Sequence, residues 1–300
     1  MGHNHNHRGT SYNSAFAVGI ALNVVFVGAE AGFGIYAGSL ALIADAGHNL
    51  SDVFSLFMAW GAALLASRAS TEKRTYGYRK LTIMASLGSA VLLLVALGGI
   101  TWEAIGRFAN PAPVEGPIVI TVAVIGVLIN SATALLFLSG QKHDLNIRAA
   151  FVHMAADAGV SVGVAISGLL IMLKGWLWID PVISLVIAVI ILLGTWGLLR
   201  DSGNLAIDAV PAGIDMTGIR QYLNRIDAVT DVHDLHVWAM STTENALTVH
   251  LVVKNPVDTN RILGKIQSHL RDSFNIEHAT IQIESRDSDY ECMLDNHSCP

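Results

Sequence analysis

Apolar residues run almost unbroken through long stretches of the first two thirds of the chain, and these stretches predict membrane-spanning helices. A helix that crosses a bilayer needs about 20 mainly apolar residues. Lipid offers no hydrogen-bond partner to an exposed backbone, so such segments form helices and not open strands. The six expected spans are residues 14–36, 40–65, 81–105, 117–139, 149–173 and 181–199.

After residue 200 the apolar positions become sparser and follow helical or alternating spacing, which predicts a small soluble domain. Asp215 is placed to cap a helix that ends near Arg225, and Asp258 is placed to cap a second helix. The expected strands are residues 229–240, 247–253 and 279–284. The expected order is therefore helix, strand, strand, helix, strand. This order predicts a domain in which two helices cover one face of a three-stranded sheet and leave the other face open.

Composition agrees with an α-helical membrane protein of six transmembrane helices that carries a small α/β C-terminal domain of the αββαβ type. Hydrophobic residues make up 52% of the chain and charged residues 14%, which excludes an ordinary soluble protein. The expected parts are a His-containing tail over 1–13, a membrane domain over 14–200, a linker over 201–212, the soluble domain over 213–286 and a Cys- and His-containing tail over 287–300.

Lys and Arg residues are divided unevenly between the loops, and this division predicts the orientation of the protein. Residues 68–80 contain five basic residues, and Lys142 and Arg148 follow the fourth span. The loops after the odd-numbered spans contain only Arg107 and Lys174. Because basic loops stay on the cytoplasmic side, both termini are expected in the cytoplasm.

The soluble third is acidic, with 7 Lys and Arg residues against 15 Asp and Glu residues over 201–300. This balance argues against a nucleic acid partner. Because the cytoplasm is reducing, Cys292 and Cys299 are expected to be free thiols.

Two copies of one polar pattern lie inside the expected spans: His48 with Asp52, and His153 with Asp157. Residues four apart on a helix share one face, so each pattern directs an imidazole and a carboxylate to one point. Two such helices facing each other would offer two imidazoles and two carboxylates to a divalent cation. The cluster would then be neutral and four-coordinate, which suits zinc.

The alternative is a pair of structural hydrogen bonds between His and Asp. Of the 12 His residues, only His48 and His153 lie within expected spans, and only these two have Asp four residues later. A carboxylate in mid-membrane costs about 2.5 to 3.5 kcal/mol, so each one needs a compensating partner. Asp45 lies about one turn before His48 on roughly the same face. It is either an outer hydrogen-bond acceptor for the metal ligands, a carboxylate on the path by which metal enters, or a residue with a structural or topogenic role.

The open face of the soluble domain is a second candidate site. His250 and Glu284 fall opposite the apolar faces of their expected strands. The phase of His233 stays unsettled, because Leu235 and Val237 share its alternation and are apolar.

Four segments, residues 39–52, 146–153, 232–238 and 276–284, resemble signatures of the cation diffusion facilitators, and the likeness extends over nearly the whole chain. The chain is most similar to the bacterial zinc branch of that family. The resemblance implies a homodimer of six-span protomers in a bacterial inner membrane, each with a cytoplasmic metallochaperone-like domain. It implies exchange of cytoplasmic metal, Zn²⁺ or also Cd²⁺, for external protons, with no organic cofactor.

The resemblance also implies roles for particular residues. The transport site would consist of His48, Asp52, His153 and Asp157. A regulatory cytoplasmic Zn²⁺ site would use His233, His250 and Glu284, and Lys80 and Asp208 would form a charge pair between the spans and the soluble domain.

Two departures from the family pattern limit this transfer. Residues 71–80 contain no His or Asp, so no metal site is expected in the loop after the second span. Gln282 and the lack of a His near Arg261 do not favour a full two-metal cytoplasmic site. The tails are either metal-capturing segments or ordinary polar ends; their soft or borderline ligands are His3, His5, His7, Cys292, His297 and Cys299.

Other functional classes fit the sequence less well. An intramembrane zinc enzyme would keep an open coordination position and a general base, and the chain contains no His-Glu-x-x-His motif. A passive metal channel would give the same metal flux after the proton gradient is dissipated. An antiporter would lose uphill metal transport under that condition. A sensory receptor would need a signalling domain, and the sequence indicates none.

Overall fold

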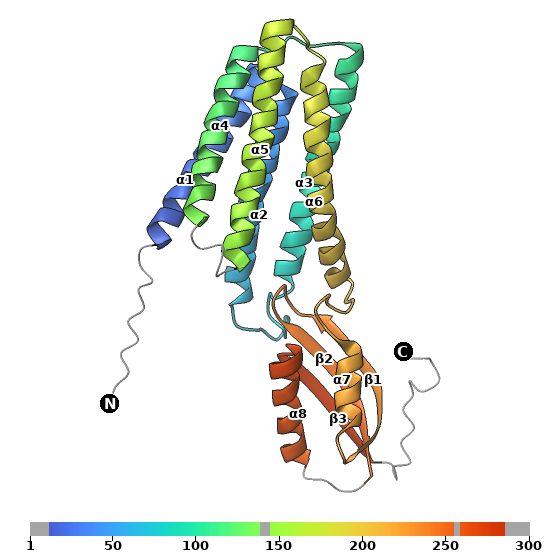
Figure 1. The fold of residues 1–300 in the computed structure, drawn as a ribbon. Helices are drawn as coiled ribbons and strands as arrows, with labels where there is room; N and C mark the ends of the chain where they lie inside the picture. Colours follow the sequence, from blue (N-terminus) through green and yellow to red (C-terminus); the bar gives the residue numbers. More distant parts are fainter. Residues whose placement is uncertain (1–11, 139–144, 255–258, 286–300) are drawn as a thin grey trace, which may run out of the picture. The chain divides into compact units, whose positions relative to one another are not determined.

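The computed structural model describes residues 12–138, 145–254 and 259–285 (Figure 1). Its first part consists of long helices. They are α1 (Tyr12–Tyr36), α2 (Leu40–Ala66), α3 (Leu81–Ala109), α4 (Gly116–Phe137), α5 (Leu145–Lys174) and α6 (Ile179–Ala206).

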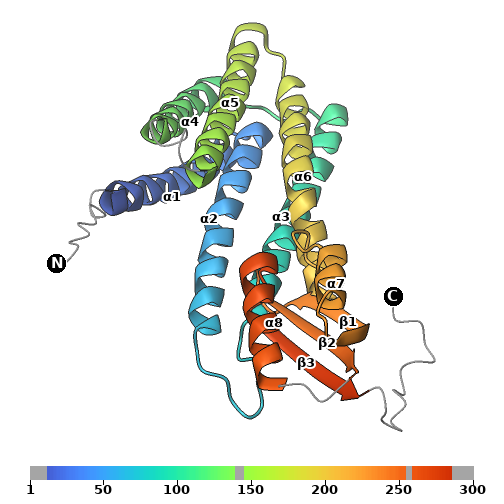
Figure 2. The ribbon, with the colours of Figure 1, turned by 60° about the horizontal axis from the view of Figure 1, so that its bottom comes forward.

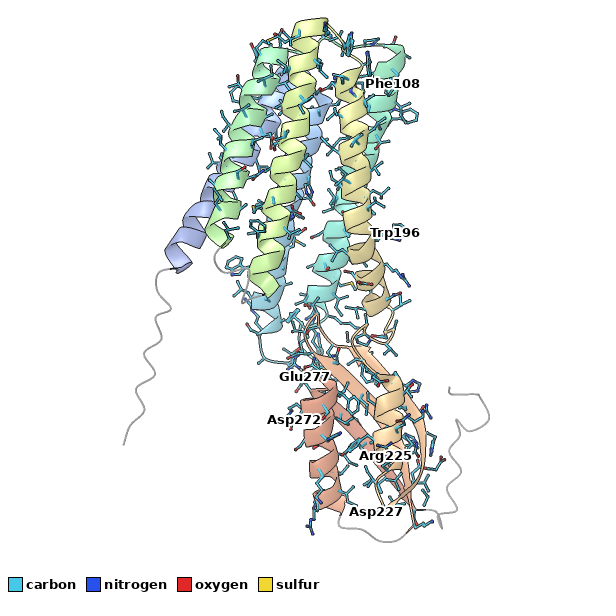
Figure 3. All side chains as sticks on the ribbon, in the orientation of Figure 1. Phe108, Trp196, Arg225, Asp227, Asp272 and Glu277 are labelled. Atoms are coloured by element: carbon cyan, nitrogen blue, oxygen red, sulfur yellow. The ribbon has the colours of Figure 1, made fainter. Side chains whose placement is uncertain are left out.

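Five of these helices, α2 to α6, are long and apolar enough to cross a membrane. Their outward side chains are large and apolar: Phe108 on α3 and Trp196 on α6 are 48% and 60% exposed (Figure 3). Such exposure is costly in water and ordinary in lipid. The helical membrane domain expected from the sequence is therefore confirmed for five helices. α1 has 25 residues, and the apolar part whose side chains are described is Val24–Tyr36.

Glycines bring α4 and α5 together, and α5 carries His153 and Asp157. A Cβ atom added to Gly116 would lie 2.9 Å from the backbone oxygen of Gly168. A Cβ atom on Gly168 would lie 3.0 Å from side-chain atoms of Val119 and Ile120. The backbones of α4 and α5 thus approach too closely for larger residues at these two positions, as is common between membrane helices.

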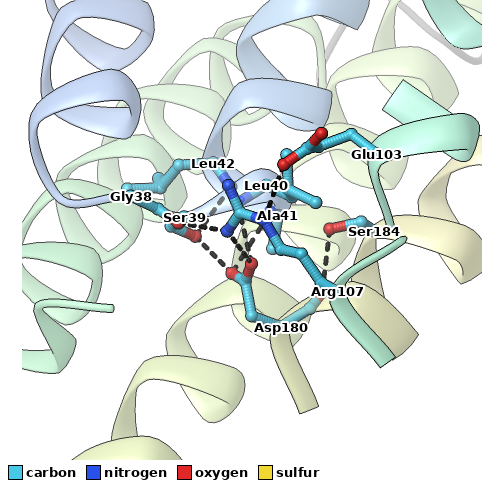
Figure 4. A network of polar contacts seen from close by, with 9 residues as sticks. All are labelled: Gly38, Ser39, Leu40, Ala41, Leu42, Glu103, Arg107, Asp180 and Ser184. Atoms are coloured by element: carbon cyan, nitrogen blue, oxygen red, sulfur yellow. Dashed lines mark hydrogen bonds and ion pairs between the residues drawn. The ribbon is translucent and has the colours of Figure 1, made fainter. Parts of the chain in front are cut away.

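The start of α2 is fixed by a carboxylate from α6 (Figure 4). The Asp180 carboxylate is completely buried and accepts hydrogen bonds from the Ser39 hydroxyl, the Leu40 N–H (2.8 Å) and the Ala41 N–H (3.3 Å). Free N–H groups at a helix N-terminus need acceptors and favour negative charge. Asp180 supplies the acceptor oxygens and the negative charge to α2, the helix that carries His48 and Asp52.

Arg107 of α3 neutralises this buried carboxylate. Its Nη1 lies 3.6 Å from Asp180 Oδ2 and donates to the Gly38 carbonyl, and its Nε donates to Glu103 Oε1 at 3.3 Å (Figure 4). The guanidinium side chain is only 13% exposed. One ion pair therefore joins α3, α6 and the loop before α2.

α6 is longer than expected, and residues 201–206 of the expected linker are helical. Polarity ends a membrane span but does not end a helix, and Ser202 is buried and hydrogen-bonds with Ser86 at 2.7 Å. The helix ends where Asp208 adopts a φ of 60°, a left-handed conformation that Asp tolerates. Lys80 Nζ lies 2.7 Å from the Asp208 carboxylate.

The C-terminal elements have the expected order, and the small α/β domain is confirmed. They are α7 (Met216–Asn224), β1 (Val229–Ala239), β2 (Asn245–Val253), α8 (Thr259–Phe274) and β3 (His278–Ser285). The sheet order is β1-β2-β3, with β1 and β2 antiparallel and β2 and β3 parallel. Asp215 caps α7 by accepting the Gly218 N–H at 3.0 Å. Asp258 lies outside the described residues.

Both helices of this domain cover the same face of the sheet (Figures 1 and 2). Ile219 and Leu223 of α7 and Ile266 and Leu270 of α8 form one buried cluster with the apolar residues of the strands. On β2 the expected alternation holds, because Leu247, Val249, Leu251 and Val253 are buried while Thr248, His250 and Val252 are half-buried. The opposite face of the sheet carries the polar side chains.

A β-bulge in β1 decides the phase of His233. His233 pairs with His250 and His236 pairs with Thr248, so three steps along β1 match two along β2. Asp234 occupies the extra position with a φ of 50°. Val232 and Leu235 therefore both face the core, and His233 lies on the open face, where simple alternation from Leu235 would not place it.

We expect Asp180→Ala to destabilise the protein by about 3–5 kcal/mol, because it leaves Arg107 as a buried charge without a partner and removes the cap of α2. Asp180→Asn, which keeps an acceptor, should cost less. Thermal unfolding in detergent measures both, with the exposed Asp201→Asn as control. Equal stability of Asp180→Ala and the control would show that the buried ion pair does not hold these helices.

Candidate metal sites

Four side chains from α2 and α5 converge on one point between the two helices. The contacts cross between the helices: His48 Nε2 lies 3.5 Å from Asp157 Oδ1, and His153 Nε2 lies 3.1 Å from Asp52 Oδ2. Within each helix, the imidazole and carboxylate four residues apart are separated by 3.8 Å on α2 and 3.6 Å on α5. The structure thus brings together all four residues of the two sequence patterns.

The geometry leaves room for a cation among the ligand atoms. One ligand atom each from His48, His153 and Asp157 lies within 4.8 Å of the others. The two imidazole rings are nearly perpendicular, with centroids 6.0 Å apart. Both rings direct Nε2 at the carboxylates, which is the arrangement that lets nitrogen and oxygen lone pairs meet at a metal.

Burial and unsatisfied atoms also fit a cation. The Asp157 side chain is 3% exposed and that of His48 is 20% exposed, whereas those of Asp52 and His153 are 37% and 42% exposed. Asp52 Oδ2 and Asp157 Oδ2 are buried without a hydrogen-bond donor. Buried polar atoms normally have partners, and a bound cation would supply the missing one. The exposed members leave one side of the cluster open.

Asp45 lies next to this cluster but outside it. It is completely buried and accepts the Ser161 hydroxyl at 2.9 Å. His48 Nδ1 is buried and has no hydrogen-bond partner, so Asp45 is not its acceptor in this conformation. Sequence reasoning gave no role to Glu30 of α1, which is also completely buried and accepts the Asn49 amide at 3.4 Å.

A second cluster lies on the open face of the C-terminal sheet. Glu284 Oε1 lies 3.0 Å from His250 Nδ1, and Glu284 Oε2 lies 3.5 Å from His233 Nε2. Ligand atoms of these three residues all lie within 4.8 Å of one another. His233 Nε2 and His250 Nδ1 are buried and make no hydrogen bond, which fits nitrogens directed at a metal. The three residues named from the sequence are therefore neighbours in space.

The bulge adds a residue that the sequence did not identify. Asp234 Oδ2 lies 3.4 Å from His250 Nε2, and Asp234 Oδ1 lies 2.8 Å from His236 Nε2. A carboxylate on the far nitrogen of a ligand imidazole fixes the orientation of the ring and raises its basicity. Gln282 plays a similar part by donating to Glu284 Oε1 at 2.8 Å. The signal in the sequence was the His-Asp-Leu-His run, but its meaning depends on the bulge.

The loop after α2 contacts the C-terminal domain. Arg79 Nη1 lies 2.9 Å from Glu244 Oε2, and the Thr242 N–H donates to the Thr82 hydroxyl at 3.1 Å. Tyr76 packs edge-on against His278, with ring centroids 5.6 Å apart. Contacts thus run from the start of α3 to the edge of the sheet. The candidate tail ligands His3, His5, His7, Cys292, His297 and Cys299 all lie outside the described residues.

Comparisons with known proteins agree with both parts of the chain. The family model of the cation efflux transmembrane domain matches residues 16–205, and that of the cytoplasmic domain of cation efflux proteins matches residues 211–286. The zinc transporter ZitB of Escherichia coli is 37% identical over 293 residues, which cover 95% of this chain and 93% of that protein.

Two further relatives are similar. The cadmium, cobalt and zinc/H(+)-K(+) antiporter of Bacillus velezensis is 35% identical over 290 residues, covering 95% of this chain and 92% of that protein. A solved structure of the metal-bound C-terminal domain of the CzcD transporter from Cupriavidus metallidurans is 33% identical and has a TM-score of 0.23. It covers 24% of this chain and 99% of its own.

Proposed function

The chain belongs to the cation efflux family, and we propose that it is a proton-coupled antiporter that exports Zn²⁺ from the cytoplasm. The observation that carries the proposal is the crossed arrangement of two imidazoles and two carboxylates between α2 and α5. Its bacterial relatives are named as metal transporters and not as enzymes. We therefore read the four-ligand cluster as a site of transport.

The ligand set favours zinc among divalent cations. Two neutral imidazoles and two carboxylates neutralise a divalent charge and give the four-coordinate tetrahedral environment that zinc prefers. Magnesium, calcium and manganese prefer oxygen ligands alone. Cd²⁺ is the second candidate, because nitrogen ligands also suit it and one relative is named for cadmium, cobalt and zinc.

The same groups couple metal to protons. Metal binds to neutral imidazole and ionised carboxylate, so protons and metal compete for His48, Asp52, His153 and Asp157. Because α2 and α5 each supply one imidazole and one carboxylate, a movement of α2 against α5 would disrupt all four ligands together. Alternating exposure of this site to the two sides, with protons displacing metal on the outside, gives export.

The charge of the loops indicates the orientation of the protein, and the second domain indicates how it assembles. The concentration of Lys and Arg over residues 68–80 favours cytoplasmic termini in a bacterial inner membrane. We propose a homodimer that is joined in part by the cytoplasmic domains. The ion pair between Lys80, just before α3, and Asp208, just after α6, supports a connection between the helices and that domain.

The cytoplasmic cluster would hold a regulatory Zn²⁺. His233, His250 and Glu284 are the proposed ligands, and their unsatisfied nitrogens support the assignment. Bound metal would join β1, β2 and β3 on the open face of the sheet. Because Arg79 and Thr82 contact residues 242–244 in the connection between β1 and β2, stiffening of the sheet would act on the start of α3 and the residues just before it.

For the transport site, we expect Asp157→Asn to reduce zinc flux by at least about tenfold, because an amide keeps the shape but loses the charge that the metal needs. The measurement is zinc uptake by proteoliposomes with and without a pH gradient, read with an entrapped zinc indicator. Asp201→Asn, an exposed carboxylate on α6, is the matched control. Wild-type flux in Asp157→Asn would refute the site.

The same vesicles distinguish an antiporter from a channel. An antiporter loses uphill zinc accumulation when the pH gradient is collapsed, whereas a channel shows the same downhill flux in both conditions. A panel of Zn²⁺, Cd²⁺ and Co²⁺ ranks the substrates. Flux that is unchanged by the gradient would contradict proton coupling.

For the cytoplasmic site, Asp234→Asn should weaken zinc binding about 10–100-fold, since it removes the carboxylate that orients His250. Calorimetric titration of the full-length protein measures this in an Asp157→Asn background, which disables the membrane site. Asp272→Asn on α8, on the helix-covered face of the sheet, is the control (Figure 3). Equal affinity in Asp234→Asn and the control would exclude this role.

A further inference from the structure

Two buried carboxyl groups near the membrane cluster are not used by the proposed metal site. Glu30 on α1 and Asp45 on α2 are both 0% exposed. The Asn49 amide, which donates to Glu30, lies one helical turn after Asp45 on the same face of α2, so the two carboxyl groups are neighbours. The described residues provide no Lys or Arg partner to either one. Two neighbouring ionised carboxylates without a cation repel each other strongly, most of all in a membrane.

The hydrogen bonds around this pair are incomplete by one donor. The Asn49 amide donates to Glu30 Oε2, and the Ser161 hydroxyl donates to Asp45 Oδ2. Glu30 Oε1 and Asp45 Oδ1 remain buried with no hydrogen-bond partner. An ionised carboxylate can only accept hydrogen bonds, so neither carboxylate can donate one to the other. No other neighbouring group among the described residues donates to these two oxygens. One proton placed between the carboxyls would satisfy both oxygens and remove the repulsion.

The position of the pair relates it to metal transport. Asp45 precedes His48 by three residues on α2, and Ser161 follows Asp157 by four residues on α5. The pair therefore lies about one helical turn from the metal ligands, toward the beginning of α2 and the end of α5. In the proposed orientation this is the side away from the cytoplasm. The titratable groups one turn away along these two helices are His48, which follows Asp45 on α2, and Asp157, which precedes Ser161 on α5.

We propose that Glu30 and Asp45 form a proton-binding site, separate from the metal ligands, that serves the exchange of metal for protons. The inference rests on the proposed antiport. With the metal site empty, one proton is shared by the two carboxyls. A divalent cation that binds from the cytoplasm about one turn away repels that proton, which is released to the cytoplasm. When the metal leaves on the outer side, a proton from the outside takes its place. The protons exchanged for each metal thus include one that no metal ligand carries.

The test distinguishes a loss of proton coupling from a loss of metal binding and transport. Glu30→Gln and Asp45→Asn keep the size and the hydrogen-bonding groups but cannot release a proton. In proteoliposomes with equal pH on both sides, exchange of radioactive Zn²⁺ for unlabelled Zn²⁺ should proceed at the wild-type rate in both variants. Accumulation of Zn²⁺ driven by a pH gradient should be lost in both. Glu115→Gln, an exposed carboxyl with no side-chain cap bond, should retain both activities.

Three results would overturn the proposal. If both variants accumulate zinc as the wild type does, the pair carries no exchanged proton. If both lose zinc exchange as well, the carboxyls only hold α1, α2 and α5 together. If wild-type accumulation requires Na⁺ or K⁺ and fails when choline replaces them, the pair holds a metal cation instead of a proton. Failure of uphill transport in the wild type itself would refute the proposed antiport, which is a separate outcome.

Discussion

The cost of charge inside a bilayer governs the rest of this structure. Each carboxylate buried among the helices must be compensated locally. Asp180 is compensated by Arg107 and by the N-terminus of α2. Asp52 and Asp157 face imidazoles from the opposite helix. We interpret this difference functionally. The charge and hydrogen bonds of Asp180 are satisfied, so this group can hold the helices together permanently. Those of Asp52 and Asp157 are satisfied only when a proton or a cation binds.

Satisfied and unsatisfied polar groups therefore lie in different parts of α2. Its beginning is capped and joined to α6 by Asp180, while its middle carries His48 and Asp52 with unsatisfied atoms. α5 is held at Gly168 by close contact with α4, and His153 and Asp157 lie more than two turns before that contact. Ligands placed at a distance from the fixed ends of their helices can change partners without disrupting the packing.

The sequence predicted the features that depend on regular geometry. The i, i+4 relation within each His-Asp pair and the alternation along β2 follow from helix and strand periods, and both are present in the structure. The sequence could not settle His233, because the bulge at Asp234 shifts its phase. It also could not indicate that Glu30 accepts a hydrogen bond from Asn49 near Asp45, since that depends on how α1 packs against α2. Hydropathy could not indicate that the helix continues beyond the apolar residues, because α6 extends through polar sequence to Ala206.

The ligands of the membrane site can be identified by X-ray absorption spectroscopy of one equivalent of Zn²⁺ bound to the full-length His250→Ala variant, in which the cytoplasmic cluster is disabled. We expect four light-atom ligands, two of them imidazole nitrogens at about 2.0–2.1 Å and two of them carboxylate oxygens. Thiolate scattering, or six oxygen ligands without imidazole, would contradict a transport site made of His48, Asp52, His153 and Asp157.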